Sequence, residues 1–237
     1  MKHLDNLILA LDTPDLEEIK LLLDELVPPL NFVKIGPVAF LPNSLELINL
    51  LKERDLSGMF DFKFFDIPTT ITNSLGFLFD INTKIFTIHS LVGPRTISTV
   101  LNELKKIEEE KNQDRPEIFG VTVLTSFDDS ELNSVGLNGN VADNVLRLAE
   151  QSIKAGVDGI VCSGDEIELI RNNFSDAVKI LVPGVRLESD NDDQRRVVSP
   201  KEAIRRGADF IVLGRTLTNA KDRKKRINDI VDTLGYN

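Results

Sequence analysis

The feature that most constrains the fold is a regular alternation of short apolar runs with longer segments of helical period. The first run, Leu7–Asp12, reads as a strand, and the segment after it has apolar residues at helical spacing, with Thr13 as its expected N-cap. Seven further runs are rich in Ile, Val and Phe, which are typical of β-strands. They are Asn31–Gly36, Gly58–Asp66, Ile85–Ser90, Ile118–Ser126, Gly159–Ser163, Lys179–Val185 and Phe210–Arg215.

Strands separated by helices run parallel, because each helix returns the chain to the starting edge of the sheet. Helical segments lie between the runs, for example at Ser44–Arg54, Pro94–Lys111 and Val141–Ala155. Eight such units in 237 residues match the size of a closed (β/α)8 barrel. We therefore predict an α/β fold, a TIM barrel with its active site at the carboxyl-terminal face of the strands, and keep an open doubly wound sheet as the alternative. No linker or composition break divides the chain, so residues 1–237 are expected to form a single domain.

The charge balance limits the classes of partner. With 28 basic and 38 acidic side chains, the formal net charge is −10 and the sequence pI is about 4.8. Nucleic acids and anionic membranes are bound through a basic field, so the sequence predicts neither as a partner. One cysteine excludes an internal disulfide, and the first apolar run is too short to span a membrane and lacks a signal-peptide pattern. A cytoplasmic protein is therefore expected.

Several predicted strands end in charged residues, although parallel strands covered on both faces are normally apolar throughout. Asp12 ends the first strand, and Lys34 lies near the end of the second. In the third strand, the two-residue period directs alternate phenylalanines toward the helices and turns Asp61 and Lys63 into the barrel. Because the carboxyl ends of all strands meet at one face, we expect four charges of alternating sign to converge there.

This expected cluster has two interpretations. Asp61 and Lys63 alone fit a structural ion pair, because charged side chains are rarely buried without a partner. A structural ion pair that only fills the end of the barrel does not need four charges, and polar residues at the carboxyl ends of barrel strands are typically catalytic. The sequence therefore predicts an active site that contains Asp12, Lys34, Asp61 and Lys63.

The last two predicted strands end in glycine and arginine, where such barrels commonly bind phosphate. Glycine lets backbone N–H groups approach an oxyanion closely, and arginine offers a permanently charged fork. The residues are Pro183, Gly184 and Arg186 after the seventh strand, and Gly214 and Arg215 after the eighth. Together they predict a phosphate site.

A polar segment, Leu187–Ser199, connects these two strand ends and contains Gln194. It is rich in charged residues and has no apolar period. Loops of this kind often close over barrel active sites and exclude water, so we predict a mobile lid.

The run Asp61-Phe62-Lys63-Phe64-Phe65-Asp66-Ile67-Pro68-Thr69-Thr70 is a specific motif when it is combined with Lys34. Supporting segments occur from the first strand to the eighth: Ala10-Leu11-Asp12, Val33-Lys34-Ile35-Gly36, Leu124-Thr125-Ser126, Pro183-Gly184-Val185-Arg186, Asp193-Gln194 and Leu213-Gly214-Arg215. Together they resemble the orotidine 5'-phosphate decarboxylase family, which makes UMP and carbon dioxide in pyrimidine synthesis. One segment departs from the family, because His89-Ser90-Leu91-Val92-Gly93 stands where His-Ala-x-Gly-Gly is usual.

The resemblance implies a carboxy-lyase that needs no metal or other cofactor. Asp12 and Lys34 would hold the ribose hydroxyls, with Lys34 also paired to Asp61. Asp61 would lie against the scissile carboxylate, where two like charges in a dry site disfavour the ground state. Lys63 would stabilise and protonate the carbanion that remains after carbon dioxide departs.

The resemblance also implies an obligate homodimer with shared active sites. Asp66, Ile67 and Thr70 would reach into the site of the neighbouring subunit. Thr125 and Ser126 would contact the base. The phosphate would be held by Gln194, Gly214, Arg215 and the segment that contains Pro183, Gly184 and Arg186.

Three other functions fit parts of the pattern. A magnesium-dependent phosphosugar decarboxylase or aldolase of the same barrel type has a similar Asp-x-Lys-x-x-Asp spacing. In those enzymes, however, the residue at the position of Lys34 resembles an acidic metal ligand. A lysine at this position would repel a divalent cation. A non-catalytic phosphate-binding barrel would keep four converging charges, whose burial costs free energy, without using them in a reaction. A hydrolase would pair Cys162 with His89 as its base, although a lone cysteine on a buried strand is usually a core residue.

Overall fold

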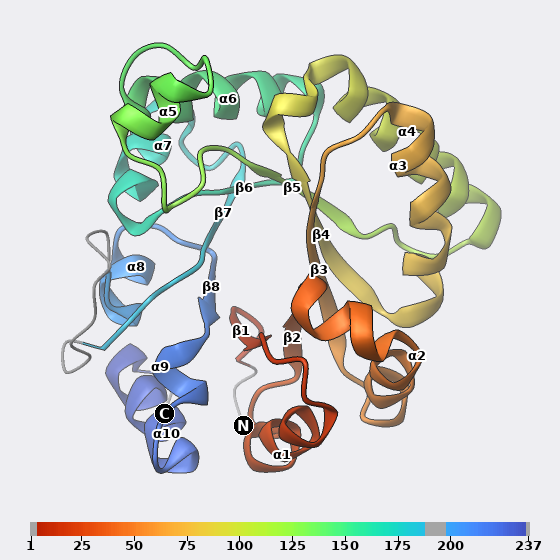
Figure 1. Ribbon diagram of the computed structural model, residues 1–237, viewed down its shortest axis with the longest axis vertical. Coiled ribbons are helices and arrows are strands. Elements are labelled where there is room, and N and C mark those ends of the chain that lie inside the picture. Colours follow the sequence, from red (N-terminus) through yellow and green to blue (C-terminus); the bar gives the residue numbers. More distant parts are fainter. Residues whose placement is uncertain (1–3, 188–197, 236–237) are drawn as a thin grey trace.

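Eight parallel strands close into a barrel in their order along the chain, and β1 pairs with both β2 and β8 (Figure 1). The computed structural model describes residues 4–187 and 198–235. The strands are β1 (Leu7–Leu11), β2 (Phe32–Ile35), β3 (Ser57–Phe64), β4 (Thr83–His89), β5 (Glu117–Val121), β6 (Gly159–Val161), β7 (Lys179–Val182) and β8 (Phe210–Leu213). The predicted TIM barrel is confirmed, and the alternative of an open sheet is wrong.

Helices surround the ring of strands (Figure 1). The α-helices are α1 (Leu16–Leu26), α2 (Pro37–Glu53), α3 (Pro68–Leu75), α4 (Pro94–Lys111), α5 (Asp129–Ser134), α6 (Val141–Ala155), α7 (Ile167–Phe174), α8 (Pro200–Arg205), α9 (Arg215–Thr218) and α10 (Arg223–Leu234). Short 3₁₀ helices are η1 (Gly76–Ile81), η2 (Ser90–Val92) and η3 (Gly164–Glu166). The bounds predicted for α4 and α6 are confirmed.

The two predicted helix starts have different outcomes. Helix α2 begins at Pro37, because proline is accepted in a first helical turn, but its backbone leaves the helical conformation at Asn43, just after Pro42, so the helix predicted from Ser44 corresponds to the second part of α2. At α1 the N-cap is Asp15, whose carboxylate accepts the first free N–H groups of the helix, and not Thr13.

All eight strands end before their predicted carboxyl ends. For example, β5 ends at Val121 rather than Ser126, and β7 ends at Val182 rather than Val185. The residues beyond these points leave the parallel ladder and form loops or the first turns of helices at the carboxyl-terminal face. The polar residues that were expected on strand ends therefore lie mostly in these loops.

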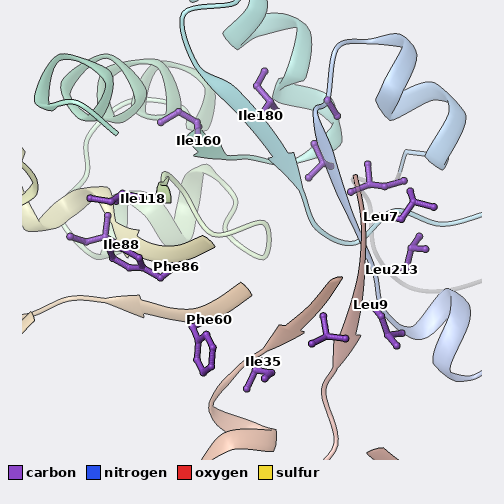
Figure 2. Close-up of a cluster of buried hydrophobic side chains, with 14 of the residues drawn as sticks. Leu7, Leu9, Ile35, Phe60, Phe86, Ile88, Ile118, Ile160, Ile180 and Leu213 are labelled. Atoms are coloured by element: carbon purple, nitrogen blue, oxygen red, sulfur yellow. The ribbon is translucent and has the colours of Figure 1, made fainter. Parts of the chain in front are cut away.

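The main core lies between the outer face of the barrel and the helices. Figure 2 shows side chains such as Leu9, Ile35 and Phe60 that project from the strands into this layer, where all three are fully buried. Burial of each such side chain contributes roughly 1.5 to 3 kcal/mol. The alternate phenylalanines of β3 lie on this side, as the two-residue period predicts, and Phe60 and Phe62 pack edge to face with ring centroids 5.7 Å apart.

A separate apolar cluster fills the inside of the barrel. At its base Phe210 packs edge to face between Phe32 and Phe119, with centroid distances of 6.2 and 5.9 Å. Gly159 makes room for one of these rings, because a Cβ atom there would lie 2.1 Å from an atom of Phe119. The lower barrel is therefore closed by side chains, and only its carboxyl-terminal end is left for a ligand.

Helices α1 and α10, near the two ends of the described chain, lie side by side (Figure 1). An ion pair joins them, with Arg223 Nη1 2.9 Å from Glu25 Oε2. Among the helices that the structure describes, none is both long and apolar enough to cross a membrane.

Candidate active site

A cavity of about 360 Å³ lies at the carboxyl-terminal face of the barrel. Its base is formed by inward-facing apolar side chains from six strands, namely Ala10, Met59, Val121, Val161, Leu181 and Val212. Ten residues that were expected in the site also line it: Asp12, Lys34, Asp61, Lys63, Thr125, Pro183, Gly184, Arg186, Gly214 and Arg215. The cavity therefore has an apolar base and a polar, charged wall.

Four charged side chains alternate in sign along part of this wall. Lys34 Nζ lies 2.6 Å from Asp12 Oδ1 and 3.7 Å from Asp61 Oδ2. Lys63 Nζ in turn lies 2.9 Å from Asp61 Oδ1 and 3.0 Å from Oδ2. The structure thus brings the four predicted charges together, and each one has a neighbour of opposite sign.

The centre of this charge chain is its most buried part. The side chains of Lys34 and Asp61 are only 10% and 15% exposed. Removing charges from water to this extent is costly unless each is paired and hydrogen-bonded. Asp61 meets that requirement with two lysines and with the hydroxyl of Thr87, which donates to Oδ1 at 3.0 Å.

Strand register and one buried amide position the first two charges. Ala10 pairs with Lys34 across β1 and β2, so Lys34 lies beside the strand whose end carries Asp12. The loop after Asp12 is attached to the kink of α2, because Asn43 Nδ2 donates to the carbonyl oxygens of Pro14 at 2.9 Å and Ala39 at 3.1 Å. The kink of α2 therefore helps to hold the site.

The ends of β7 and β8 contribute the second polar part of the wall. Gly184 has a φ of 72°, a left-handed conformation that glycine adopts without strain. Arg186 is 7% exposed and reaches the cavity wall. Thr216 donates from Oγ1 to the carbonyl oxygen of Val185 at 3.2 Å, which joins the segment after β8 to the segment after β7. Arg186, Arg215 and two glycines, Gly184 and Gly214, thus border one side of the cavity.

Several predicted residues do not line this cavity. Asp66, Ile67 and Thr70 are exposed between the end of β3 and the first turn of α3, and Ser126 is exposed after β5. Asp66 accepts the N–H group of the next residue at 2.6 Å. Gln194 and residues 188–197 of the predicted lid lie outside the described residues.

Two threonines of the site were missed by the sequence analysis. Thr87 interrupts the apolar run of β4 two residues before His89, and this polar interruption is the signal that could have identified it. Thr216 directly follows the expected phosphate pair of Gly214 and Arg215, so its position also offered a signal. Both residues act on the site through hydrogen bonds to its other members.

His89 and Cys162 do not form a nucleophile and base pair. The His89 ring lies 5.7 Å from the ring of Phe65, and its Nδ1 accepts the Leu91 N–H group. Burial, and then the charge of Lys63, lower the pKa of His89. Burial raises the pKa of the Cys162 thiol well above its usual value, so this cysteine stays protonated and unreactive.

Comparisons with known proteins agree over nearly the whole chain. A family model described as "Orotidine 5'-phosphate decarboxylase / HUMPS family" matches residues 5–230. The orotidine 5'-phosphate decarboxylase of Actinobacillus succinogenes is 36% identical over 229 residues, which is 96% of this chain and 97% of the relative. That of Pasteurella multocida is 35% identical over 232 residues, or 98% of each chain. The crystal structure of orotidine 5'-phosphate decarboxylase from Lactobacillus acidophilus matches with a TM-score of 0.84 at 29% identity, covering 97% of this chain and 99% of that chain.

Proposed function

The chain belongs to the orotidine 5'-phosphate decarboxylase / HUMPS family, and we propose that it converts orotidine 5'-phosphate to UMP and carbon dioxide. The activity is that of a carboxy-lyase in pyrimidine nucleotide synthesis. The observation that carries the proposal is the chain of alternating charges from Asp12 to Lys63 along the cavity wall, above an apolar base. Such a site binds a polar substrate and concentrates charge where the reaction needs it.

The ribose and the base have separate candidate contacts. Asp12 and Lys34 form a close pair at the cavity wall, and their oxygen and nitrogen atoms suit the ribose hydroxyl groups. The Thr125 region follows β5 on another part of the wall and would contact the pyrimidine, with Ser126 next to it. This arrangement would direct the carboxylate of the substrate toward Asp61 and Lys63.

The chemical step follows from the charges of these two residues. Asp61 repels a carboxylate placed against it, and loss of carbon dioxide removes that repulsion. The electrons of the broken C–C bond remain on the pyrimidine carbon as a carbanion. Lys63 stabilises this negative charge and then transfers a proton from Nζ to the carbon, which yields UMP.

The phosphate group would bind between the ends of β7 and β8. Arg215 and Arg186 supply permanent positive charge, while Pro183, Gly184 and Gly214 bring backbone close to the same wall. The protein as a whole has a net charge of −10, so these local cations must hold the anion against the overall field. Gln194 is a further proposed contact outside the described residues.

A homodimer with shared sites is proposed from large apolar side chains that are exposed on α2 and just after β3. Val38, Leu41 and Leu45 are large apolar side chains of α2 with exposures of 52%, 78% and 72%. Phe65 and Ile67 are also large, apolar and exposed, just after β3. Large apolar side chains that stay exposed mark an interface when a second copy can cover them. A second copy bound here would cover these residues and receive Asp66, Ile67 and Thr70 in its own site.

The magnesium-dependent alternative is disfavoured by the position of Lys34. Its ammonium group lies between the carboxylates of Asp12 and Asp61, where a divalent cation would need acidic ligands free of a competing charge. Within residues 4–187 and 198–235, no three His, Cys, Asp or Glu side chains come together as a possible metal site.

A single domain over residues 1–237 and a cytoplasmic location stay predictions.

The proposed reaction is tested by mixing purified protein with orotidine 5'-phosphate in the presence of a chelator and following the loss of substrate absorbance. We expect complete conversion to UMP, identified by chromatography. Lys63→Ala protein, purified in the same way, controls for decarboxylase from the expression host. Activity that disappears with chelator and returns with magnesium would assign the protein to the metal-dependent alternative, and a lack of turnover in both conditions would contradict the proposal.

A further inference from the structure

The pairing between β3 and β4 is interrupted beside the active site. Phe60 pairs with Phe86 and Phe64 pairs with Ile88, so three residues of β3 lie opposite Thr87 alone. Two of those three residues are Asp61 and Lys63. A bulge of this kind re-aims side chains and leaves backbone groups of the bulged strand without a ladder partner.

The side chain of Thr87 replaces the missing ladder contact. The backbone N–H group of Lys63 donates to Thr87 Oγ1 at 2.9 Å. Because Oγ1 accepts that hydrogen bond, its own proton is available to Asp61, and it donates to Oδ1 at 3.0 Å. One hydroxyl therefore connects the backbone of the expected proton donor to the carboxylate beside it.

Both groups that bind this hydroxyl need a contact that fixes their conformation. Lys63 has a φ of 45°, a left-handed conformation that is strained for a residue with a side chain. Asp61 is largely buried, and its carboxylate has to keep one orientation to face a substrate. Thr87 itself is fully buried, and its branched Cβ restricts χ1, so its hydroxyl is a rigid support.

We propose that Thr87 is a positioning residue for decarboxylation, which it supports by fixing Asp61 and the Lys63 backbone in one geometry. This inference depends on the proposed function, since it assigns the two charges to the reacting carbon of orotidine 5'-phosphate. Thr87 touches no reacting atom. Its effect should fall on the chemical step rather than on substrate binding, because the ribose and phosphate contacts lie elsewhere in the cavity.

The test compares Thr87→Val with Thr87→Ser. Valine keeps the branched shape but removes the hydroxyl, whereas serine keeps the hydroxyl. We expect Thr87→Val to lower kcat about 100-fold, the effect of small misplacements at active sites, with KM and the Kd for UMP within about threefold of wild type. Thr87→Ser should recover kcat to within about fivefold of wild type.

Thr122→Val is the matched control. Thr122 is another fully buried threonine that follows the neighbouring strand β5, but its hydroxyl donates, among the residues that the structure describes, only to the backbone carbonyl of Val161 at 3.2 Å. We expect its kcat to stay within about twofold of wild type, because no charged group depends on it. Equal losses in Thr87→Val and Thr122→Val would overturn the proposal, as would wild-type kcat in Thr87→Val or a lack of recovery in Thr87→Ser.

Two further measurements separate the possible failures. If Thr87→Val does not fold, as judged by circular dichroism, Thr87→Ala takes its place with the same expected loss of kcat, and wild-type kcat there overturns the proposal. If the wild-type protein does not decarboxylate orotidine 5'-phosphate, the proposed function fails by itself. Crystal structures of wild type and the folded variant then decide on Thr87, because an unchanged Asp61 carboxylate and Lys63 φ would show that the hydroxyl positions neither.

Discussion

Lys63 Nζ lies 2.9 Å from Oδ1 and 3.0 Å from Oδ2 of Asp61, so an ammonium group bridges both oxygens of the carboxylate two residues before it. The two side chains differ in access to the cavity, because Lys63 is 39% exposed and Asp61 only 15%. A substrate that enters the cavity therefore meets the lysine more readily. This relationship suits Lys63 to the proposed proton transfer and Asp61 to the proposed role of the fixed charge next to it.

We predict that Lys63→Ala lowers kcat at least about 1000-fold, because both proton donation and stabilisation of the carbanion are lost. The Kd for UMP should change by less than about tenfold, since these contacts are made chiefly in the transition state. Stopped assays for kcat and calorimetry for UMP binding provide the measurements. Lys154→Ala, at an exposed lysine of α6, is the control and should resemble wild type. A Lys63→Ala enzyme with kcat near wild type would show that another group donates the proton.

We predict that Arg215→Ala raises KM for orotidine 5'-phosphate and also lowers kcat. Binding energy from a remote phosphate can support closure of the site and offset repulsion at the reacting carboxylate, so its loss affects both constants. We expect kcat/KM to fall about 100-fold or more for the phosphorylated substrate and to change little for the unphosphorylated nucleoside. Steady-state kinetics with both substrates measure this difference.

Arg205→Ala, at an exposed arginine of α8 that pairs with Glu202, is the control for the loss of a positive charge. It should leave both substrates unaffected, because salt screens a distant surface charge. If Arg215→Ala were impaired equally with nucleotide and nucleoside, the phosphate would have to bind elsewhere, with Arg186 as the next candidate.

The barrel was predictable from sequence because its signals are local. Apolar runs and helical periods recur along the chain, and the two-residue period within β3 places Asp61 and Lys63 on the inner face and Phe60 on the outer. The charged strand ends were also visible, since a lysine such as Lys34 breaks an otherwise apolar strand. Closure of the barrel follows from the number of units.

The details that join neighbouring strands were not predictable in the same way. The bulge opposite Thr87 depends on the register between β3 and β4, which no local pattern within either strand specifies. The choice of Asp15 over Thr13 as N-cap has a similar origin, because both residue types cap helices well. The loop between them is held by Asn43 of α2, a contact that only the folded chain brings about.

We predict that His89 makes the protein less stable at acidic pH. Burial and Lys63 lower the pKa of His89 below its ordinary value of 6.5, while the unfolded chain keeps that ordinary value. As the pH falls through 6.5, the unfolded state therefore binds the proton more readily, and the folded state loses stability until the pH is below the folded pKa. His89→Gln removes this contribution.

Urea unfolding of wild type and His89→Gln at pH 7.5, 6.5 and 5.5, values about one unit either side of the ordinary histidine pKa, measures the effect. The free energy of unfolding of wild type, relative to the variant, should decrease toward the acidic end. All other titrating groups are shared by the two proteins and cancel in this difference. Parallel curves over the whole range would contradict a lowered pKa for His89.

The proposed shared site predicts that two inactive variants restore activity together. If Asp66 serves the neighbouring site while Lys63 serves its own, a dimer of one Lys63→Ala and one Asp66→Ala subunit has one site with both changes and one site with neither. Random exchange of equal amounts makes half of the dimers mixed, so activity should approach about a quarter of wild type. Assays before and after mixing under conditions that allow exchange measure the recovery.

Gel filtration of each variant first shows whether it still forms dimers, and mixing subunits that carry different affinity tags shows that exchange has taken place. Lys63→Ala mixed with Arg215→Ala is the matched control, because both residues line the cavity of their own subunit. In that mixed dimer each site keeps one change, so no recovery is expected. The exposed position of Asp66 beside Phe65 and Ile67 is what makes a contribution to a second subunit physically reasonable. If demonstrated exchange restores no activity, Asp66 acts within its own chain, and the apolar surface next to it must have another role.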